Sequence, residues 1–73
     1  MLERSRHMRT IGERIKEIRK SNTLTQSEFA EKVCVSRPHI TNIENNKENP
    51  SSMLIRLISL LFSISEDWII NGE

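Results

Sequence analysis

Residues 26–44 read QSEFAEKVCVSRPHITNIE, and this stretch contains more information about the fold than any other part of the chain. Its apolar residues recur at helical spacing and do not alternate as they would in a half-buried strand. A tight break at Cys34 and Val35 divides the stretch into two short segments. The pattern therefore predicts two short helices that pack against each other across a sharp turn.

Seven positions in this stretch carry the residue types that a helix-turn-helix requires. Ala30 is small where the two helices would cross closely, and Cys34 is small where the chain would turn sharply. Five apolar side chains are placed to lock the angle between the helices: Phe29, Val33, Val35, Ile40 and Ile43. Three such matches could arise by chance, but seven together with correct helix caps indicate the motif strongly.

Helix start signals predict three further helices around this pair. The segments Thr10–Glu13 and Thr25–Glu28 both fit the S/T-x-x-E capping box, in which each end satisfies a backbone N–H of the other. The predicted N-caps are Thr10, Thr25, Ser36, Ser51 or Ser52, and Ser65. The chain is therefore predicted to be all-α, with five short helices of which the second and third form the helix-turn-helix.

Composition excludes several classes of protein. With 73 residues, 36% hydrophobic and 29% charged, the chain suits one small globular domain. Cys34 is the only cysteine, and His7, Cys34 and His39 are too few and too badly spaced for a structural zinc site. No apolar run is long enough to cross a membrane or to form a signal peptide, so a cytoplasmic protein is expected. No cofactor, metal or small-molecule ligand is evident.

An enzyme is also not expected. The chain has two scattered glycines, which provide no phosphate-binding loop, and Asp67 is its only aspartate. Cys34 and His39 have no partner groups that would complete a nucleophilic site. Charge is uneven, because residues 1–20 hold seven Arg and Lys against three Glu, and this is weak support for a polyanionic partner.

Residues 11–73 resemble the lambda-type phage repressor and Cro helix-turn-helix domains, often called the XRE type, over 63 of the 73 residues. The resembling motifs are Leu24-Thr25-Gln26, Phe29-Ala30-Glu31-Lys32-Val33, Ile43-Glu44-Asn45, Lys47, Pro50-Ser51 and residues 64–72, ISEDWIING. The resemblance implies a DNA-binding domain over residues 10–73. It further implies a transcriptional regulator of the prophage-repressor kind, which binds double-stranded DNA at a palindromic operator as a dimer.

The resemblance also implies site residues. Positions that match base-reading residues are Arg37, Pro38, His39, Thr41 and Asn42, and positions that match phosphate-binding residues are Gln26, Asn45 and Lys47. Arg37 is the best candidate, because a guanidinium can bind O6 and N7 of guanine together. Pro38 departs from the glutamine or serine common at this position, so no known operator code transfers. His39 has an alternative role as a merely exposed residue.

The resemblance also implies a structural ion pair. Arg19 and Glu44 match an internal pair that joins the first helix to the end of the third in some relatives.

The apolar arc of the helix expected near residues 52–62 is wider than a surface helix needs, which favours a dimer surface on the last two helices and agrees with the resemblance. The candidate residues of this surface are Ile55, Phe62, Trp68, Ile69 and Ile70. The helical wheel of residues 52–62 predicts a core stripe of Leu54, Leu57, Ile58 and Leu61. Burial of that helix nearly all round is the alternative to a dimer surface.

Some alternatives stay open. Residues 1–9 either form a basic arm that touches phosphates or belong to a cloning junction at His7-Met8. The same fold would also serve an antitoxin that represses its own operon or a restriction-modification controller. A different class is a protein-interaction module that has lost DNA binding.

Overall fold

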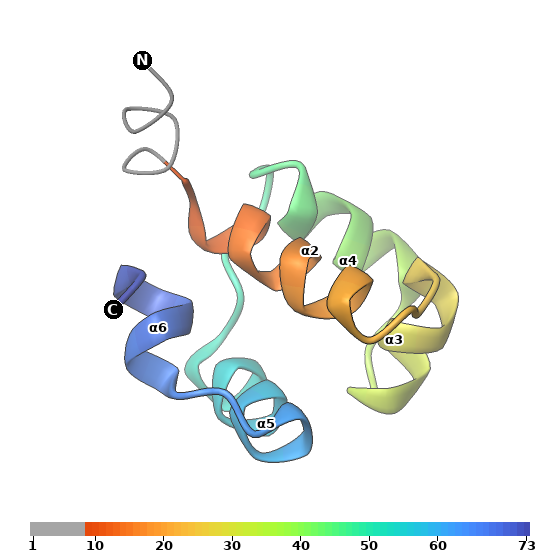
Figure 1. Ribbon diagram of the computed structural model, residues 1–73. Helices are drawn as coiled ribbons and strands as arrows, with labels where there is room; N and C mark the ends of the chain where they lie inside the picture. Colours follow the sequence, from red (N-terminus) through yellow and green to blue (C-terminus); the bar gives the residue numbers. More distant parts are fainter. Residues whose placement is uncertain (1–8) are drawn as a thin grey trace.

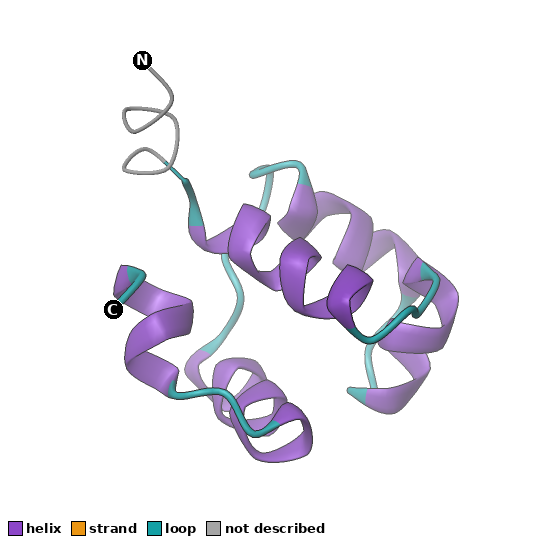
Figure 2. Cartoon of the chain, in the orientation of Figure 1, coloured by secondary structure: helices purple, strands orange, loops and turns teal. Residues whose placement is uncertain are grey.

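The computed structural model describes residues 9–73, and all regular structure in that range is helical (Figures 1 and 2). The helices are α2 (Ile11–Ser21), α3 (Gln26–Lys32), α4 (Arg37–Glu44), α5 (Ser52–Phe62) and α6 (Glu66–Asn71). The predicted all-α fold of five short helices is confirmed for these residues. The basic arm or cloning junction expected over residues 1–9 lies, apart from Arg9, outside the described range.

Local sequence signals set the start of each of the helices α2 to α6. Side-chain oxygens of the N-cap residues accept hydrogen bonds from the first helical turns, and the caps are Thr10, Thr25, Ser36, Ser51 and Ser65. Both predicted capping boxes are complete, with Glu13 and Glu28 returning the hydrogen bond. Each cap contributes about 1 kcal/mol, which matters for helices of six to eleven residues.

The helix-turn-helix is formed by α3 and α4. Phe29, Ala30 and Ile40 are buried between the two helices and the rest of the core. Cys34 turns the chain in the left-handed region, with φ of 64°. Most residues avoid this region because Cβ crowds the backbone, and glycine is the usual solution. Because the side chain of Cys34 is exposed, its role in the fold is to form this turn and not to fill the core.

Helix α2 packs against α4 on one side and against α6 on the other, while α5 and α6 close the core from below in the view of Figure 1. Its inward residues Ile15 and Ile18 are buried with Ile58 of α5 and Ile69 of α6. Phe62 of α5 stacks on Phe29 of α3, with ring centroids 5.4 Å apart. One hydrophobic core therefore connects the helix-turn-helix to the last two helices.

The orientation of α5 differs from the prediction. Its buried residues are Leu54, Ile55 and Ile58, whereas Leu61 is 51% exposed. The core stripe is thus rotated toward Ile55 and away from Leu61. Nearly every position of α5 is apolar, so a helical wheel did not determine which arc would meet the other helices.

A buried arginine joins α2 to α6. The guanidinium of Arg14 donates to three backbone carbonyls: Nε to Ile69 at 2.8 Å, Nη2 to Ile70 at 2.8 Å and Nη1 to Arg9 at 2.9 Å. Two of these oxygens belong to the last turn of α6, where carbonyls lack helical partners and the helix dipole favours a cation. Arg14 therefore completes the C-terminal end of α6, a role that the sequence did not reveal.

Candidate nucleic-acid interface

Helix α4 presents a polar face to solvent on the side opposite its buried residues. At 100° per residue, Arg37, Thr41 and Asn45 follow one another along this face, and Pro38 and Asn42 lie beside them. Ile40 and Ile43 point into the core instead. Arg37 and Pro38 are exposed, and Thr41 and Asn42 are half-buried. The structure thus brings four of the five predicted base-reading residues onto one face.

His39 lies at the edge of this face. Its Nδ1 is 2.6 Å from Oε1 of Glu48, which belongs to the loop after α4. The carboxylate of Glu48 partly offsets the positive charge of Lys47, which directly precedes it in the sequence. Glu48 was not singled out from the sequence, because its contact with His39 depends on how the loop folds back.

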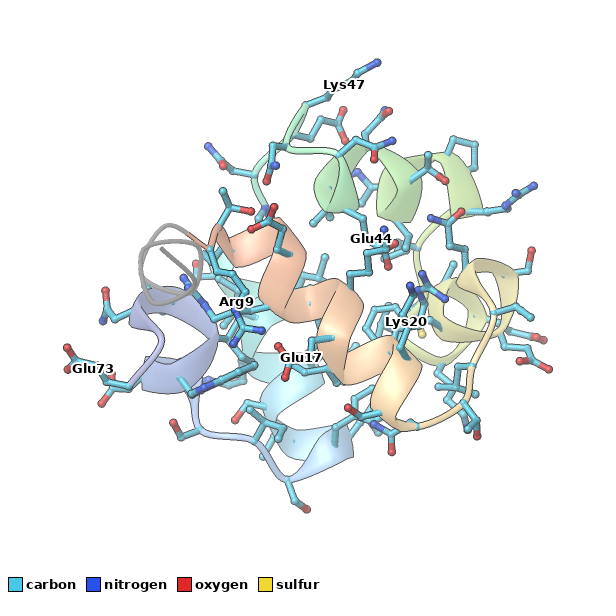
Figure 3. The ribbon with its side chains drawn as sticks, turned by 45° about the horizontal axis from the view of Figure 1, so that its top comes forward. Arg9, Glu17, Lys20, Glu44, Lys47 and Glu73 are labelled. Carbon is cyan, nitrogen blue, oxygen red and sulfur yellow. The ribbon has the colours of Figure 1, made fainter. Side chains whose placement is uncertain are left out.

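The loop after α4 has a defined shape. Asn46 is in the left-handed region with φ of 64°, and the backbone N–H of Lys47 donates to the carbonyl of Asn42 at 2.8 Å. Asn45 and Lys47 are both exposed, and the amine of Lys47 extends away from the body of the molecule (Figure 3). These two predicted phosphate-binding residues therefore flank the C-terminal end of α4.

The ion pair between Arg19 and Glu44 is present and almost completely buried. Nε of Arg19 lies 2.7 Å from Oε2 of Glu44, and Nη2 lies 3.1 Å from Oε1. The side chains are 10% and 1% exposed. The third Arg19 group, Nη1, donates to the carbonyl of Leu24 at 2.9 Å. The pair holds the end of α4 to α2 and leaves no unsatisfied donor or acceptor in a buried position.

Gln26 extends this network toward the outer face of α4. Its Nε2 donates to Oε1 of Glu44 at 3.0 Å, and its Oε1 accepts from the hydroxyl of Thr41 at 2.9 Å. Gln26 is half-buried at the first position of α3, where backbone N–H groups are free and the dipole favours an anion. The contacts of Gln26 with Glu44 and Thr41 were not predicted, because nothing in the local sequence connects residues 15 and 18 positions apart.

The residues expected at a dimer surface divide into two groups. Ile55 and Ile69 are 6% and 0% exposed, so the structure assigns them to the core of the single chain. Phe62 and Trp68 are half-buried, and Ile70 is exposed. The guanidinium of Arg9 lies 5.9 Å from the Trp68 ring centre and pairs with Glu17. The exposed large apolar residues of the described chain are Met53, Leu60, Leu61 and Ile70.

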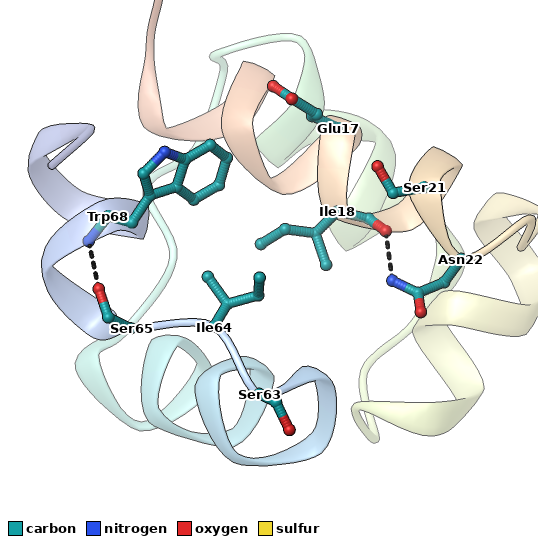
Figure 4. A pocket seen from close by; sticks show the side chains of 8 residues that line it. All are labelled: Glu17, Ile18, Ser21, Asn22, Ser63, Ile64, Ser65 and Trp68. Carbon is teal, nitrogen blue, oxygen red and sulfur yellow. Dashed lines mark hydrogen bonds between the residues drawn. The ribbon is translucent and has the colours of Figure 1, made fainter.

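A shallow groove separates α2 from α6 on the far side of the molecule from the loop after α4. Figure 4 shows its lining, which consists of Glu17, Ile18, Ser21, Asn22, Ser63, Ile64, Ser65 and Trp68. Asn22 Nδ2 donates to the Ile18 carbonyl at 2.7 Å, and Ser65 Oγ accepts from the Trp68 N–H at 2.9 Å. Two polar side chains of the groove, those of Asn22 and Ser65, are therefore used in hydrogen bonds at helix ends.

Within residues 9–73, no cluster of His, Cys, Asp and Glu is arranged to hold a metal ion. None of the helices in the same range is both long enough and apolar enough to cross a membrane.

Comparisons with known proteins agree with this geometry. Residues 15–69 match the family model described as helix-turn-helix. The chain is 38% identical over 64 residues to the immunity repressor protein of Bacillus phage phi105, covering 88% of this chain and 44% of that protein. It is 36% identical over 64 residues to the transcriptional regulator SinR of Bacillus licheniformis, covering 86% and 58%.

Two other matches broaden the comparison. The antitoxin PezA of Streptococcus pneumoniae serotype 4 is 42% identical over 55 residues, covering 75% of this chain and 35% of that protein. The crystal structure of the P22 c2 repressor in complex with a synthetic operator matches with a TM-score of 0.83 at 26% identity, covering 90% of this chain and all of that one. The chain spans about a third to three fifths of the curated relatives. The resemblance to phage repressors is confirmed.

Proposed function

This chain belongs to the helix-turn-helix family, and we propose that it is a sequence-specific, double-stranded DNA-binding regulator of transcription, acting as a repressor of the prophage kind. The observation that carries the proposal is the polar outer face of α4, on which Arg37, Thr41 and Asn42 lie together. The similarity to a repressor solved on its operator supports it, since that match extends over 90% of the chain. A regulator of this kind works in the cytoplasm, where the DNA is.

In this proposal α4 enters the major groove and reads bases from its first turns. Arg37 binds guanine through O6 and N7, a contact worth about 1–3 kcal/mol of discrimination. Asn42 pairs with adenine or turns to a phosphate, and Pro38 packs against a thymine methyl. His39 lies at the edge of the face and is held by Glu48. Its contact with the DNA is therefore at the border of the base-reading site.

Phosphate contacts set the register and provide most of the affinity. Gln26 retains one unused Nε2 hydrogen, which is placed at the positive N-terminal end of α3. Asn45 and Lys47 contact the backbone from the loop after α4. Such contacts release counterions, so the affinity is expected to fall steeply with salt concentration.

We further infer a homodimer that binds a palindromic operator through two half-sites one DNA turn apart. The exposed apolar residues support such a surface, because Met53 and Leu60 lie on one face of α5 and Ile70 is exposed on α6. Trp68 contributes from its half-buried position, whereas Phe62 lies on the opposite side of α5 from Leu60 and stacks on Phe29. Ile55 and Ile69 support this surface from the core beneath and make no contact across it.

The proposal is tested by selecting binding sites from a random duplex pool at low and near-physiological salt. An enriched inverted repeat is the expected result and would identify the operator. A single enriched half-site would contradict the dimer while leaving specific DNA binding in place. No enrichment at either salt concentration would overturn the proposal and favour a protein-interaction module. The similarity to PezA also makes autorepression by an antitoxin a variant of the same DNA-binding function.

A further inference from the structure

The chain of hydrogen bonds from Arg19 to Thr41 has a fixed direction. A guanidinium only donates hydrogen bonds, and an ionised carboxylate only accepts them. Glu44 accepts from Arg19 on both of its oxygens, and Oε1 also lies 3.0 Å from the Gln26 amide. Gln26 must therefore turn its NH₂ group toward Glu44, because the opposite orientation would place two acceptor oxygens against each other.

The orientation of the Gln26 amide also fixes the hydrogen-bonding role of the Thr41 hydroxyl. With its NH₂ group toward Glu44, Gln26 presents Oε1, which only accepts, to Thr41 at 2.9 Å. The single hydroxyl hydrogen of Thr41 is thereby used inside the protein. Its oxygen keeps a lone pair that is free to accept a hydrogen bond from outside. Thr41 stands on the outer face of α4, one helical turn after Arg37.

From this geometry we propose that Thr41 reads DNA as a hydrogen-bond acceptor, and that Gln26 is the positioning residue that makes it one. The inference rests on the proposed function, because it requires α4 to lie in the major groove. In that groove the donors are the amino groups of adenine (N6) and cytosine (N4), whereas guanine O6 and N7 and thymine O4 accept. Thr41 therefore selects adenine or cytosine on the strand that it faces, and rejects guanine and thymine there.

The test is a comparison of operators selected by the wild-type protein and by three single variants. Thr41→Val removes the hydroxyl and keeps the shape, Thr41→Ser keeps the hydroxyl, and Gln26→Leu removes the acceptor that holds the hydroxyl hydrogen. Circular dichroism and thermal melting establish that each variant is folded. Affinities are then measured for the selected operator and for a copy with one base pair reversed, which exchanges amino and keto groups between the strands.

We expect one position of each half-site to carry adenine or cytosine in wild-type selections, with reversal costing about 2- to 10-fold, the range for one net hydrogen bond. Thr41→Val should lose this discrimination and Thr41→Ser should retain it. Gln26→Leu should weaken binding to all duplexes through its lost phosphate contact. At the base pair that Thr41 contacts, Gln26→Leu should also reduce the difference in affinity between the two orientations of that base pair to about 2-fold or less. The reason is that the freed hydroxyl of Thr41 can then donate a hydrogen bond.

The double variant Gln26→Leu with Thr41→Val tests whether Gln26 affects this base pair through Thr41 or independently of it. If Gln26 acts on this base pair through Thr41, the double variant discriminates as poorly as Thr41→Val alone. The inference is overturned if the position affected by Thr41→Val carries guanine or thymine, if no position is affected, or if Gln26→Leu keeps the full preference. Failure of the wild-type protein to enrich any site would overturn DNA binding itself, an outcome distinct from these three.

Discussion

Gly12 in the first turn of α2 lies directly against the backbone carbonyl of Ile43 in α4. A Cβ atom on Gly12 would overlap that carbonyl oxygen and would come within 2.9 Å of Oδ1 of Asn46. The obstacle is backbone near the end of a packed helix, so a rotamer change does not relieve it. The absence of a side chain at this position allows α2 and α4 to approach closely.

Gly12→Ala should therefore destabilise the protein, although alanine is the better helix former by about 1 kcal/mol. We expect a net loss of about 1–3 kcal/mol, the usual cost of overpacking a tight contact. Urea denaturation measures it. Lys20→Ala, at an exposed position of the same helix, is the control and should change stability by less than about 0.5 kcal/mol. Equal stability of Gly12→Ala and wild type would contradict the close approach.

Glu44→Ala should cost about 3 kcal/mol, because it leaves the buried guanidinium of Arg19 without its carboxylate. Arg56→Ala is the matched control, since Arg56 and Glu66 form an exposed pair at 3.1 Å that contributes little. Thermal melting compares the two. An unchanged melting temperature for Glu44→Ala would show that the ion pair is absent in solution.

The pair can also be replaced as a whole. Changing Arg19→Met together with Glu44→Leu should recover much of the stability lost by Glu44→Ala, because both charges leave the core at once. Even so, the double variant is expected to lose discrimination at the base pair that Thr41 contacts, since Gln26 then has no carboxylate to orient its amide. Stability and discrimination would thus respond differently to the same substitutions.

Arg37→Ala and Lys47→Ala should affect DNA binding in different ways. Removal of Arg37 should cost about 1–3 kcal/mol on the selected operator and relax the preference at one base pair. Removal of Lys47 should weaken all duplexes alike and lower the slope of log affinity against log salt by about 1. Fluorescence anisotropy titrations at several salt concentrations separate the two. If neither substitution changes any DNA complex, α4 is not the recognition helix.

Leu60→Glu tests the proposed dimer surface. Leu60 is 72% exposed in the single chain, so a charge there should leave folding intact. A glutamate facing its own symmetry mate should weaken association and remove cooperative binding to a palindromic operator, while a single half-site is still bound. Analytical ultracentrifugation and half-site titrations are the measurements. Lys32→Gln, at an exposed position of α3, lowers the net charge by the same one unit and is the control.

The elements that were predictable depended on neighbouring residues. Helix starts follow from a cap and a partner three residues later, so Thr10 and Thr25 were identified with their glutamates. The sharp turn at Cys34 followed from the residue types around it, whereas its left-handed φ is known only from the structure. Arg19 and Glu44 were found only through the resemblance to known repressors, because 25 residues separate them.

The features that were missed depend on the packing of distant segments. Arg14 appeared to be one of several basic residues near the start of the chain, and only the position of α6 makes it a buried cap. Ile55 was assigned to the surface because α5 is apolar on nearly all sides, and its rotation is set by Phe29 and the other core residues. The one available signal for Gly12 was a glycine inside a helical pattern.

The three carbonyl contacts of Arg14 also affect how the molecule opens. A helix of only six residues would ordinarily fray, and its amide hydrogens would exchange quickly with solvent. Here the last turn of α6 is bound to a residue buried in α2, 55 positions earlier. Detachment of α6 would expose the buried arginine and the side chain of Ile69 together. The hydrogen-bonded amides in the last turn of α6 should therefore exchange only through global unfolding, so that the helix-turn-helix and the last helix form one cooperative unit.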